Sequence, residues 1–275
     1  MAGTDPLAIV RLGPDDALAG LALSIEAHWN QNEADWRFFL SRGTVFGIRD
    51  RDGRLIATAA LLPYSSGNAW ISMVLVTADW RRRGIATRLV DTCLDTATKL
   101  GLTTWLDATP DGATVYGPLG FTPALQLRRL HLKRSAPEKA GAPPSVAALG
   151  EFIARDSGAM GFDRGILLGE LGGRPHSRLV SNGGASALVR DGRTARYIGP
   201  LFADGSDRAL ALVHDIVGSE TGPILIEAVA SQQQFITGLS DSGWTIERPF
   251  QRMRFGRASA RPSELPYAVA GPEYG

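Results

Sequence analysis

Apolar and polar positions divide the first half of the chain into short strands and longer helices. Apolar runs and alternations predict strands, and apolar positions three and four residues apart predict helices. The predicted strands cover residues 8–12, 44–48, 54–62, 69–76, 103–107 and 121–132. The predicted helices cover residues 14–25, 28–40 (with a break near 30–32), 84–100 and 112–117. The order βααβββαβαβ indicates an α/β fold with a mixed sheet of the α+β type.

A similar order of elements follows residue 145. Residues 134–145 are polar and rich in proline and alanine, which is typical of a linker. Beyond them we predict helices at 146–156, 207–217 and 231–239, and strands at 176–180, 185–190, 195–201, 223–228 and 244–255. The pattern therefore predicts related domains at 1–133 and 146–257, followed by a tail at 258–275.

The most specific local pattern lies where the apolar strand at 71–76 meets a basic turn and then a helix. The turn reads Arg81-Arg82-Arg83-Gly84-Ile85-Ala86-Thr87. The first N–H groups of a helix lack intrahelical acceptors and lie at the positive end of its dipole. Glycine lets the backbone approach a ligand closely, and arginine pairs with phosphate oxygens. This turn therefore predicts a phosphate-binding loop.

Residues 76–89 resemble the acetyl-CoA signature of the GCN5-related N-acetyltransferases (GNAT), Arg/Gln-x-x-Gly-x-Gly/Ala. Arg81, Gly84 and Ala86 fill its defined positions. Further along, Tyr116-Gly-Pro-Leu-Gly-Phe121 is similar to the Tyr-x-x-x-Gly-Phe motif that closes this domain. The resemblance implies an N-acetyltransferase that uses acetyl-CoA as co-substrate. The cofactor contacts it implies are Val74, Leu75, Val76, Arg81, Arg82, Arg83, Gly84, Ile85, Ala86, Thr87 and Tyr116.

The resemblance also assigns the chemistry of acetyl transfer. It implies a bulge in the strand before the loop and a separation of that strand from the next. A backbone N–H at position 74, 75 or 76, with Leu75 preferred, would then bind the oxyanion. Tyr116 would protonate the departing thiolate, since the phenol reference pKa of about 10 lies above the thiol value of about 8.5.

The acceptor amine is expected near the first two helices, where Trp29 lies among Glu26, His28 and Glu33. An aromatic ring and carboxylates suit a cationic amine. The general base stays open, because the strand at 70–76 carries no acid. Glu26, His28, Glu33, Asp35 and Asp107 are its candidates.

The second half carries a degenerate version of the loop. Residues 198–207 contain no Arg-x-x-Gly-x-Gly, and Pro200 lacks an N–H donor. We therefore predict that this half does not bind CoA. The segments Ile198-Gly-Pro200 and Gly271-Pro-Glu-Tyr-Gly275 resemble two-domain GNAT proteins with a YitH-type C-terminal domain. Glu227 lies in an apolar strand and needs a partner, for which Arg196 and Arg252 are candidates.

The tail has a composition typical of disorder, although an alternative is that it folds back over the acceptor pocket.

The overall composition limits the possible partners and location of the chain. A net charge of +1 over 275 residues argues against nucleic acid or an anionic membrane as partner. There is no apolar run long enough to span a membrane and no leader, so we expect a cytoplasmic protein. The four histidines are scattered, which predicts no metal site, and Cys93 fits a packed residue better than a nucleophile.

The expected function is acetyl transfer to a primary amine of a small molecule. Two alternatives remain open at this point. One is acetylation of protein lysine or N-terminal amines. The other is a non-catalytic acyl-CoA-binding module, motivated by the missing acid. The oligomeric state is also open.

Overall fold

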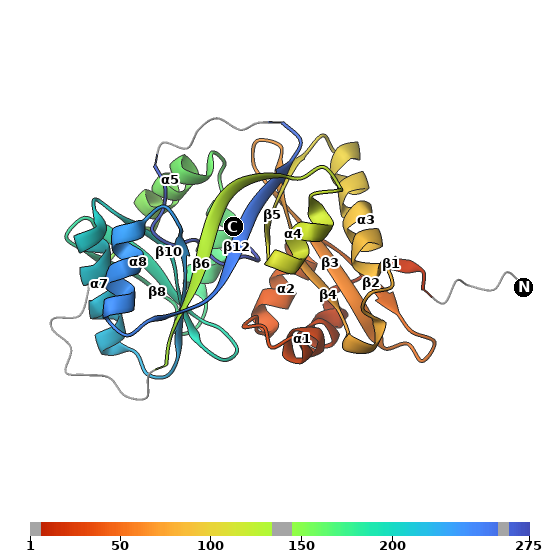
Figure 1. The fold of residues 1–275 in the computed structure, drawn as a ribbon, viewed down its shortest axis with the longest axis horizontal. Helices are drawn as coiled ribbons and strands as arrows, with labels where there is room; N and C mark the ends of the chain where they lie inside the picture. The colour runs from red at the N-terminus through yellow and green to blue at the C-terminus, as the bar shows by residue number, and fades with distance from the viewer. Residues whose placement is uncertain (1–6, 134–144, 258–263) are drawn as a thin grey trace, which may run out of the picture. The chain divides into compact units, whose positions relative to one another are not determined.

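The computed structural model describes residues 7–133, 145–257 and 264–275. The chain forms two compact units, Met1–Leu106 with Arg254–Gly256, and Asp107–Met253 with Arg257–Gly275 (Figure 1). This division differs from the predicted ranges 1–133 and 146–257. The physical reason is strand pairing, since residues 127–132 of β6 (Thr122–Leu132) pair with the whole of β11 (Ile224–Val229) in the second unit.

The first unit is a sheet in the order β1-β2-β3-β4-β5 with helices around it. Its strands are β1 (Ile9–Arg11), β2 (Thr44–Arg49), β3 (Leu55–Tyr64), β4 (Asn68–Val76) and β5 (Thr103–Ala108). Its helices are η1 (Pro14–Asp16), α1 (Ala17–Glu26), α2 (Glu33–Arg42), η2 (Ala78–Trp80) and α3 (Ile85–Lys99). Neighbouring strands run antiparallel except β4 and β5, which are parallel.

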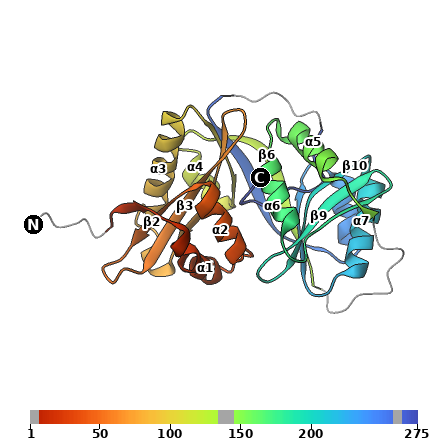
Figure 2. The ribbon, with the colours of Figure 1, turned by 180° about the vertical axis from the view of Figure 1, so that it is seen from behind.

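Helices α1 and α2 pack tightly against each other in this unit. The ring of Trp36 is fully buried, and a Cβ on Gly20 would lie 2.4 Å from it. The indole N–H donates to Ser24 Oγ at 3.0 Å. Figure 2 shows both helices beside β3. The predicted helix at 28–40 begins only at Glu33, because Asn32 and Asp35 form reciprocal capping bonds.

The second unit repeats this order around a sheet with strands β12-β6-β11-β10-β9-β8-β7. Besides β6 and β11, its strands are β7 (Ser145–Val146), β8 (Arg178–Asn182), β9 (Ala185–Asp191), β10 (Arg196–Ala203) and β12 (Thr245–Phe255). Its helices are α4 (Pro110–Tyr116), α5 (Leu149–Met160), α6 (Gly165–Gly173), α7 (Ser206–Ser219) and α8 (Gln233–Asp241). Helices α7 and α8 lie side by side (Figure 1) and share an apolar core with β9, β10 and β11.

Two features of this unit differ from the sequence expectation. Helix α6 has no predicted counterpart, since glycine disfavours helices, yet its leucines at 167, 168 and 171 are buried on one side. The second feature is the end of the chain, which we call the tail segment (residues 264–275). It was expected to be disordered, but most of its side chains from Pro266 onward are buried. Residues 258–263 lie outside the described residues.

Candidate active site in the first unit

Strand β4 carries a bulge in the middle of the sheet. Thr58 pairs with Leu75 and Ala60 with Ser72, so Met73 and Val74 together face a single residue of β3. Met73 has φ 52°, a left-handed value that costs energy for a residue with a side chain. Thr58 Oγ1 donates to the Met73 carbonyl at 2.8 Å and holds the bulge in place. The bulge implied by the sequence resemblance is therefore confirmed.

The parallel pairing of β4 with β5 stops just before this bulge. It covers only three register pairs, from Asn68↔Thr103 to Trp70↔Trp105. The indole N–H of Trp105 in β5 donates to Asn68 Oδ1 in β4 at 3.0 Å, which adds a side-chain bond to the paired part of the two strands. Beyond Trp70, the described residues of β5 give β4 no register partner. The expected separation of the two strands is thus also confirmed, and it leaves one edge of residues 71–76 for another group.

The predicted phosphate loop follows β4 after the short η2. Arg82 and Gly84 both have left-handed backbones, with φ 60° and 72°. Helix α3 begins at Ile85 after Gly84, and no side chain caps its first turn. A Cβ on Gly84 would find no heavy atom within 4 Å, so the space beside the loop is open. Uncapped N–H groups at a helix start beside open space fit a bound anion.

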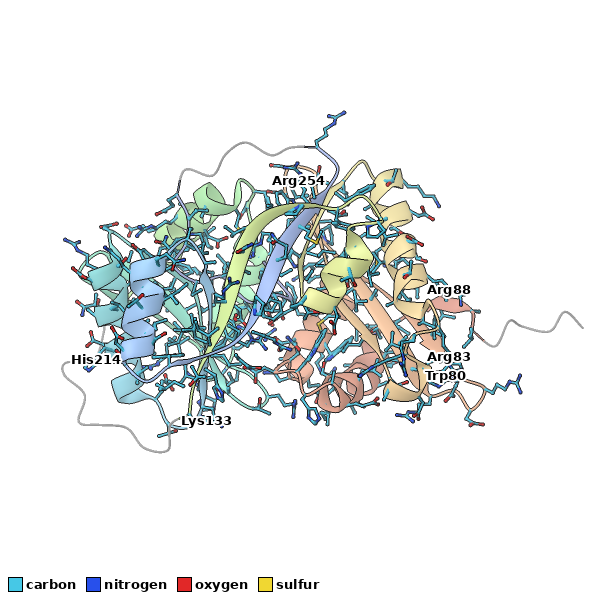
Figure 3. The ribbon with its side chains drawn as sticks, viewed as in Figure 1. Trp80, Arg83, Arg88, Lys133, His214 and Arg254 are labelled. Atoms are coloured by element: carbon cyan, nitrogen blue, oxygen red, sulfur yellow. The ribbon has the colours of Figure 1, made fainter. Side chains whose placement is uncertain are left out.

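The three arginines of the loop have different environments. Arg81 Nε donates to the Val76 carbonyl at 3.1 Å and ties the loop to the end of β4. Arg83 donates to the Asp79 carbonyl at 2.8 Å, and its guanidinium stacks 4.8 Å from the centre of the Trp80 ring (Figure 3). Arg82 is exposed. Two of the three side chains therefore fix the shape of the loop, in addition to any charge that they contribute.

Glu26 supports the same loop from α1. Its Oε1 accepts a hydrogen bond from the N–H of Ala78 at 2.8 Å, and its Oε2 lies 3.3 Å from Arg54. The bond joins residues 52 positions apart in the sequence, so no local pattern could have indicated it. It gives Glu26 a positioning role beneath the loop, beside its predicted role toward the acceptor.

The other predicted acceptor residues gather at the turn between α1 and α2. His28 has a left-handed backbone with φ 57° and an exposed side chain. Trp29 is half-buried, and its backbone N–H donates to the Ser24 carbonyl at 2.9 Å. Glu33 pairs with Arg37 one turn later in α2. Their contact with a substrate stays a prediction.

Buried polar atoms near β4 and this turn also fit a bound group. Ser72 Oγ, next to the bulge, and Gln31 Oε1, in the turn, are buried without a hydrogen-bond partner in the described structure. A buried polar atom left unpaired is costly, so such atoms commonly meet a ligand or water. Sequence reasoning missed Gln31, since a single glutamine in a turn gives no signal.

Two further candidates belong to the second compact unit. Tyr116 ends α4, and its ring centre lies 5.9 Å from that of Phe121. Its role toward the thiolate stays a prediction. The side chain of Asp107 is fully buried and accepts two 2.9 Å hydrogen bonds from Arg252. This ion pair occupies both carboxylate oxygens of Asp107, and its role as general base stays a prediction.

The partner of Glu227 differs from the expectation. Glu227 pairs with Arg129, which lies opposite it in the β11–β6 register, and not with Arg196 or Arg252. Arg196 pairs with Asp191 and Glu220, while Arg252 pairs with Asp107. Burial raises the pKa of Glu227 to about 7, although the nearby Arg129 lowers it.

The described residues show neither a cluster of metal ligands nor a membrane-spanning helix. Within the ranges 7–133, 145–257 and 264–275, no three His, Cys, Asp or Glu side chains gather as metal ligands. No helix in those ranges combines the length and apolar character needed to cross a membrane.

Known proteins share this arrangement. The family described as "Acetyltransferase (GNAT) family" matches residues 19–120, and "Acetyltransferase (GNAT) domain" matches residues 153–268. A Bacillus subtilis (strain 168) protein described as "Uncharacterized N-acetyltransferase YitH" is 22% identical over 86% of this chain and 87% of its own length.

Two solved structures show the same fold. One is a putative acetyltransferase from Pyrococcus horikoshii, with a TM-score of 0.80, 19% identity and coverage of 100% of this chain and 98% of its own. The other is a tandem GNAT protein from the clavulanic acid biosynthesis pathway, with a TM-score of 0.63, 16% identity and coverage of 92% and 100%. With both of its halves matched, the chain belongs to the GCN5-related N-acetyltransferase family and carries two GNAT domains in tandem.

Proposed function

We propose that the first unit binds acetyl-CoA and transfers its acetyl group to a primary amine of a small molecule. One observation carries this proposal. The bulge at Met73 and the unpaired edge of β4 are followed, after the short η2, by the open loop at Gly84. A linear co-substrate with a phosphate at one end and a thioester at the other fits such a track.

Each part of the track suits one part of acetyl-CoA. The uncapped N–H groups after Gly84 would bind the pyrophosphate, helped by the charge of Arg82. The free edge of residues 74–76 would pair with the amides of the pantetheine arm, much as a neighbouring strand would. No metal ion is required, since backbone donors and arginine supply the positive charge.

The reaction then needs three groups. The amine nitrogen attacks the thioester carbon, forming the C–N bond as the carbonyl oxygen becomes an oxyanion. Backbone N–H groups at the bulge, with Leu75 as first candidate, would stabilise that oxyanion. The C–S bond then breaks, and Tyr116 would give its proton to the thiolate sulfur. The attacking amine loses its proton to water or to a nearby carboxylate, for which β4 itself offers no acid.

The acceptor would enter beside the turn between α1 and α2. Trp29 and His28 lie there, and Glu33 adds a carboxylate at the start of α2. We also propose a cytoplasmic location, since Cys93 is a buried free thiol and the chain has no second cysteine.

The test is the release of free CoA thiol from acetyl-CoA in the presence of a diverse panel of amines. Cys93 is buried, so the protein should add little to the thiol signal. Release stimulated by one class of small amine supports the proposal. Stimulation by lysine peptides or peptide N-termini alone would replace the small molecule with a protein acceptor. No release of CoA thiol with any amine, together with measured acetyl-CoA binding, would point to a non-catalytic module.

The role of Tyr116 has a separate test. The variant Tyr116→Phe keeps the ring that packs against Phe121 and removes only the hydroxyl. If the hydroxyl protonates the thiolate, kcat should fall by about 100-fold or more while acetyl-CoA affinity stays the same. Unchanged turnover at saturating substrates would remove Tyr116 from the mechanism.

A further inference from the structure

The second unit repeats the strand separation of the first. Strands β10 and β11 pair in parallel only at Arg196↔Ile224 and Tyr197↔Leu225. The pairing of β10 with β9 also shifts register between Ile198 and Leu201, at the place where β4 carries its bulge. Past these residues, β10 and β11 no longer pair with each other in the described structure.

The chain itself fills this separation. Ala268 of the tail segment bridges Leu201 of β10 on one side and Ala228 of β11 on the other, antiparallel to both. Toward β10, Leu201 N–H donates to the Ala268 carbonyl at 2.9 Å, and Tyr267 N–H donates to the Leu201 carbonyl at 2.8 Å. The tail segment therefore provides hydrogen-bond partners for backbone groups of β10 that have no partner on β11.

Two further bonds complete the pairing toward β11. Val229 N–H donates to the Tyr267 carbonyl at 3.0 Å, and Val269 N–H donates to the Glu227 carbonyl at 3.0 Å. Ala268 is fully buried and Val269 is 1% exposed. The tail thus forms backbone hydrogen bonds with both separated strands.

Buried arginines anchor the rest of the tail segment. Arg190 of β9 forms an ion pair with Glu273 at 2.8 Å and donates to the Ala270 carbonyl at 3.1 Å. Arg164, at the start of α6, binds the backbone oxygens of Tyr274 and Gly275 at 2.9 and 2.5 Å. Figure 2 marks the end of the chain beside α6. These contacts hold the end of the tail segment against β9 and the start of α6.

We propose that the tail segment is a built-in occupant of the second unit, in the position that the pantetheine arm of acetyl-CoA takes in the first unit. The chain then binds one acetyl-CoA, in the first unit only. The comparison with pantetheine rests on the proposed function, whereas the docking of the tail does not.

The helix start next to this separation agrees with a peptide occupant in place of a phosphate-bearing one. Helix α7 follows Gly205, and its first turn carries Asp207. Asp204 precedes the turn. Arg208 lies in the same turn, and Asp204 pairs with Arg208 and Arg155, so charges of both signs meet at this helix start, whereas residues 81–83 of the first unit are three arginines.

A single methyl group can test the docking. A Cβ on Gly199 would lie 2.0 Å from the Val269 carbonyl oxygen, so Gly199→Ala cannot coexist with the docked tail unless the backbone shifts. Gly205→Ala is the matched control, because Gly205 also has a positive φ, 137°, but open space around its Cβ position.

Hydrogen exchange of the backbone amides gives the readout. In the unmodified chain, the amides of Leu201, Val229 and Val269 should be protected. In Gly199→Ala they should exchange faster by at least about tenfold, and in Gly205→Ala they should keep their protection. Free exchange of Val269 in the unmodified chain, or full protection in Gly199→Ala, would overturn the proposal.

A second arm uses a chain that stops at residue 263, with a synthetic peptide of residues 264–275 added back. The peptide should bind at one per chain and restore protection at Leu201 and Val229. If the shortened chain does not fold, the alanine variants still decide the question.

Calorimetric titration with acetyl-CoA separates the two proposals. A stoichiometry of one per chain is the expected result, and two per chain would overturn the exclusion of CoA from the second unit. No binding at all, with the tail amides protected, would contradict the proposed function and leave the docking of the tail intact.

Discussion

Two glycines at opposite ends of α3 allow the phosphate loop to be tested against a matched control. Gly84 has φ +72° and Gly101 has φ +68°, and a Cβ at either position would meet no heavy atom within 4 Å. Alanine therefore creates no clash at either site. Its cost is the left-handed backbone conformation, about 1–2 kcal/mol for a residue with a Cβ.

The two positions should show that cost differently. Gly101→Ala should lower Tm by a few degrees and leave acetyl-CoA affinity unchanged, because Gly101 lies at the far end of the helix. At Gly84, a loop that relaxes out of the left-handed conformation no longer presents its N–H groups to the phosphate. Acetyl-CoA binding must then restore that conformation, and a penalty of 1–2 kcal/mol corresponds to a dissociation constant that is about 5–30-fold higher.

Calorimetric titration with acetyl-CoA and thermal unfolding of both variants provide the measurements. An unchanged Kd for Gly84→Ala, together with a Tm loss equal to that of Gly101→Ala, would refute the reasoning. It would mean that the loop keeps its shape and that no phosphate approaches Gly84.

Three further predictions concern buried charges and the thiol. Because burial raises the pKa of Glu227 from 4.5 to about 7, the fold favours its neutral form. The free energy of unfolding should therefore fall as pH rises from about 4.5 to about 7. At about 1.4 kcal/mol per pH unit, the total fall is roughly 3 kcal/mol. Urea titrations should show that this pH dependence is lost in Glu227→Gln. Asp156→Asn leaves Arg164 buried without its carboxylate, so the free energy of unfolding should fall by about 3–5 kcal/mol. Glu33→Gln, at a surface ion pair, should change the free energy of unfolding by less than about 1 kcal/mol. A similar loss in both variants would contradict the burial argument. Burial raises the pKa of the Cys93 thiol to about 12, so iodoacetamide at pH 8 should alkylate it only after unfolding, and rapid labelling of the native protein would show that the thiol is accessible.

Local patterns were sufficient to predict the strand, loop and helix that form the candidate site. The apolar run before Arg81 and the amphipathic run after Gly84 extend over enough residues for periodicity to be read directly. The bulge at Met73 came instead from family resemblance, since nothing in an apolar run indicates which residue leaves the ladder.

Contacts between distant segments could not be read from the sequence. The bond from Glu26 to the Ala78 N–H joins α1 to the loop after β4, and the pair of Glu227 with Arg129 joins strands on either side of the linker. Each depends on which distant segments pack together, and that is decided by the fold of the whole unit. The buried tail was missed for the same reason, because its order comes from β10 and β11 and not from its own composition.

The pairing of β6 with β11 has a consequence for how this chain can be divided. All six residues of β11 have register partners on β6, from Ile224↔Leu132 to Val229↔Leu127, and β6 precedes the linker. A fragment that begins after the linker would contain the whole second family match and still expose an unpaired inner strand. Such an edge recruits other chains and leads to aggregation. The two GNAT domains are therefore separable as sequence repeats, but cutting the chain at the linker does not yield two independent folding units.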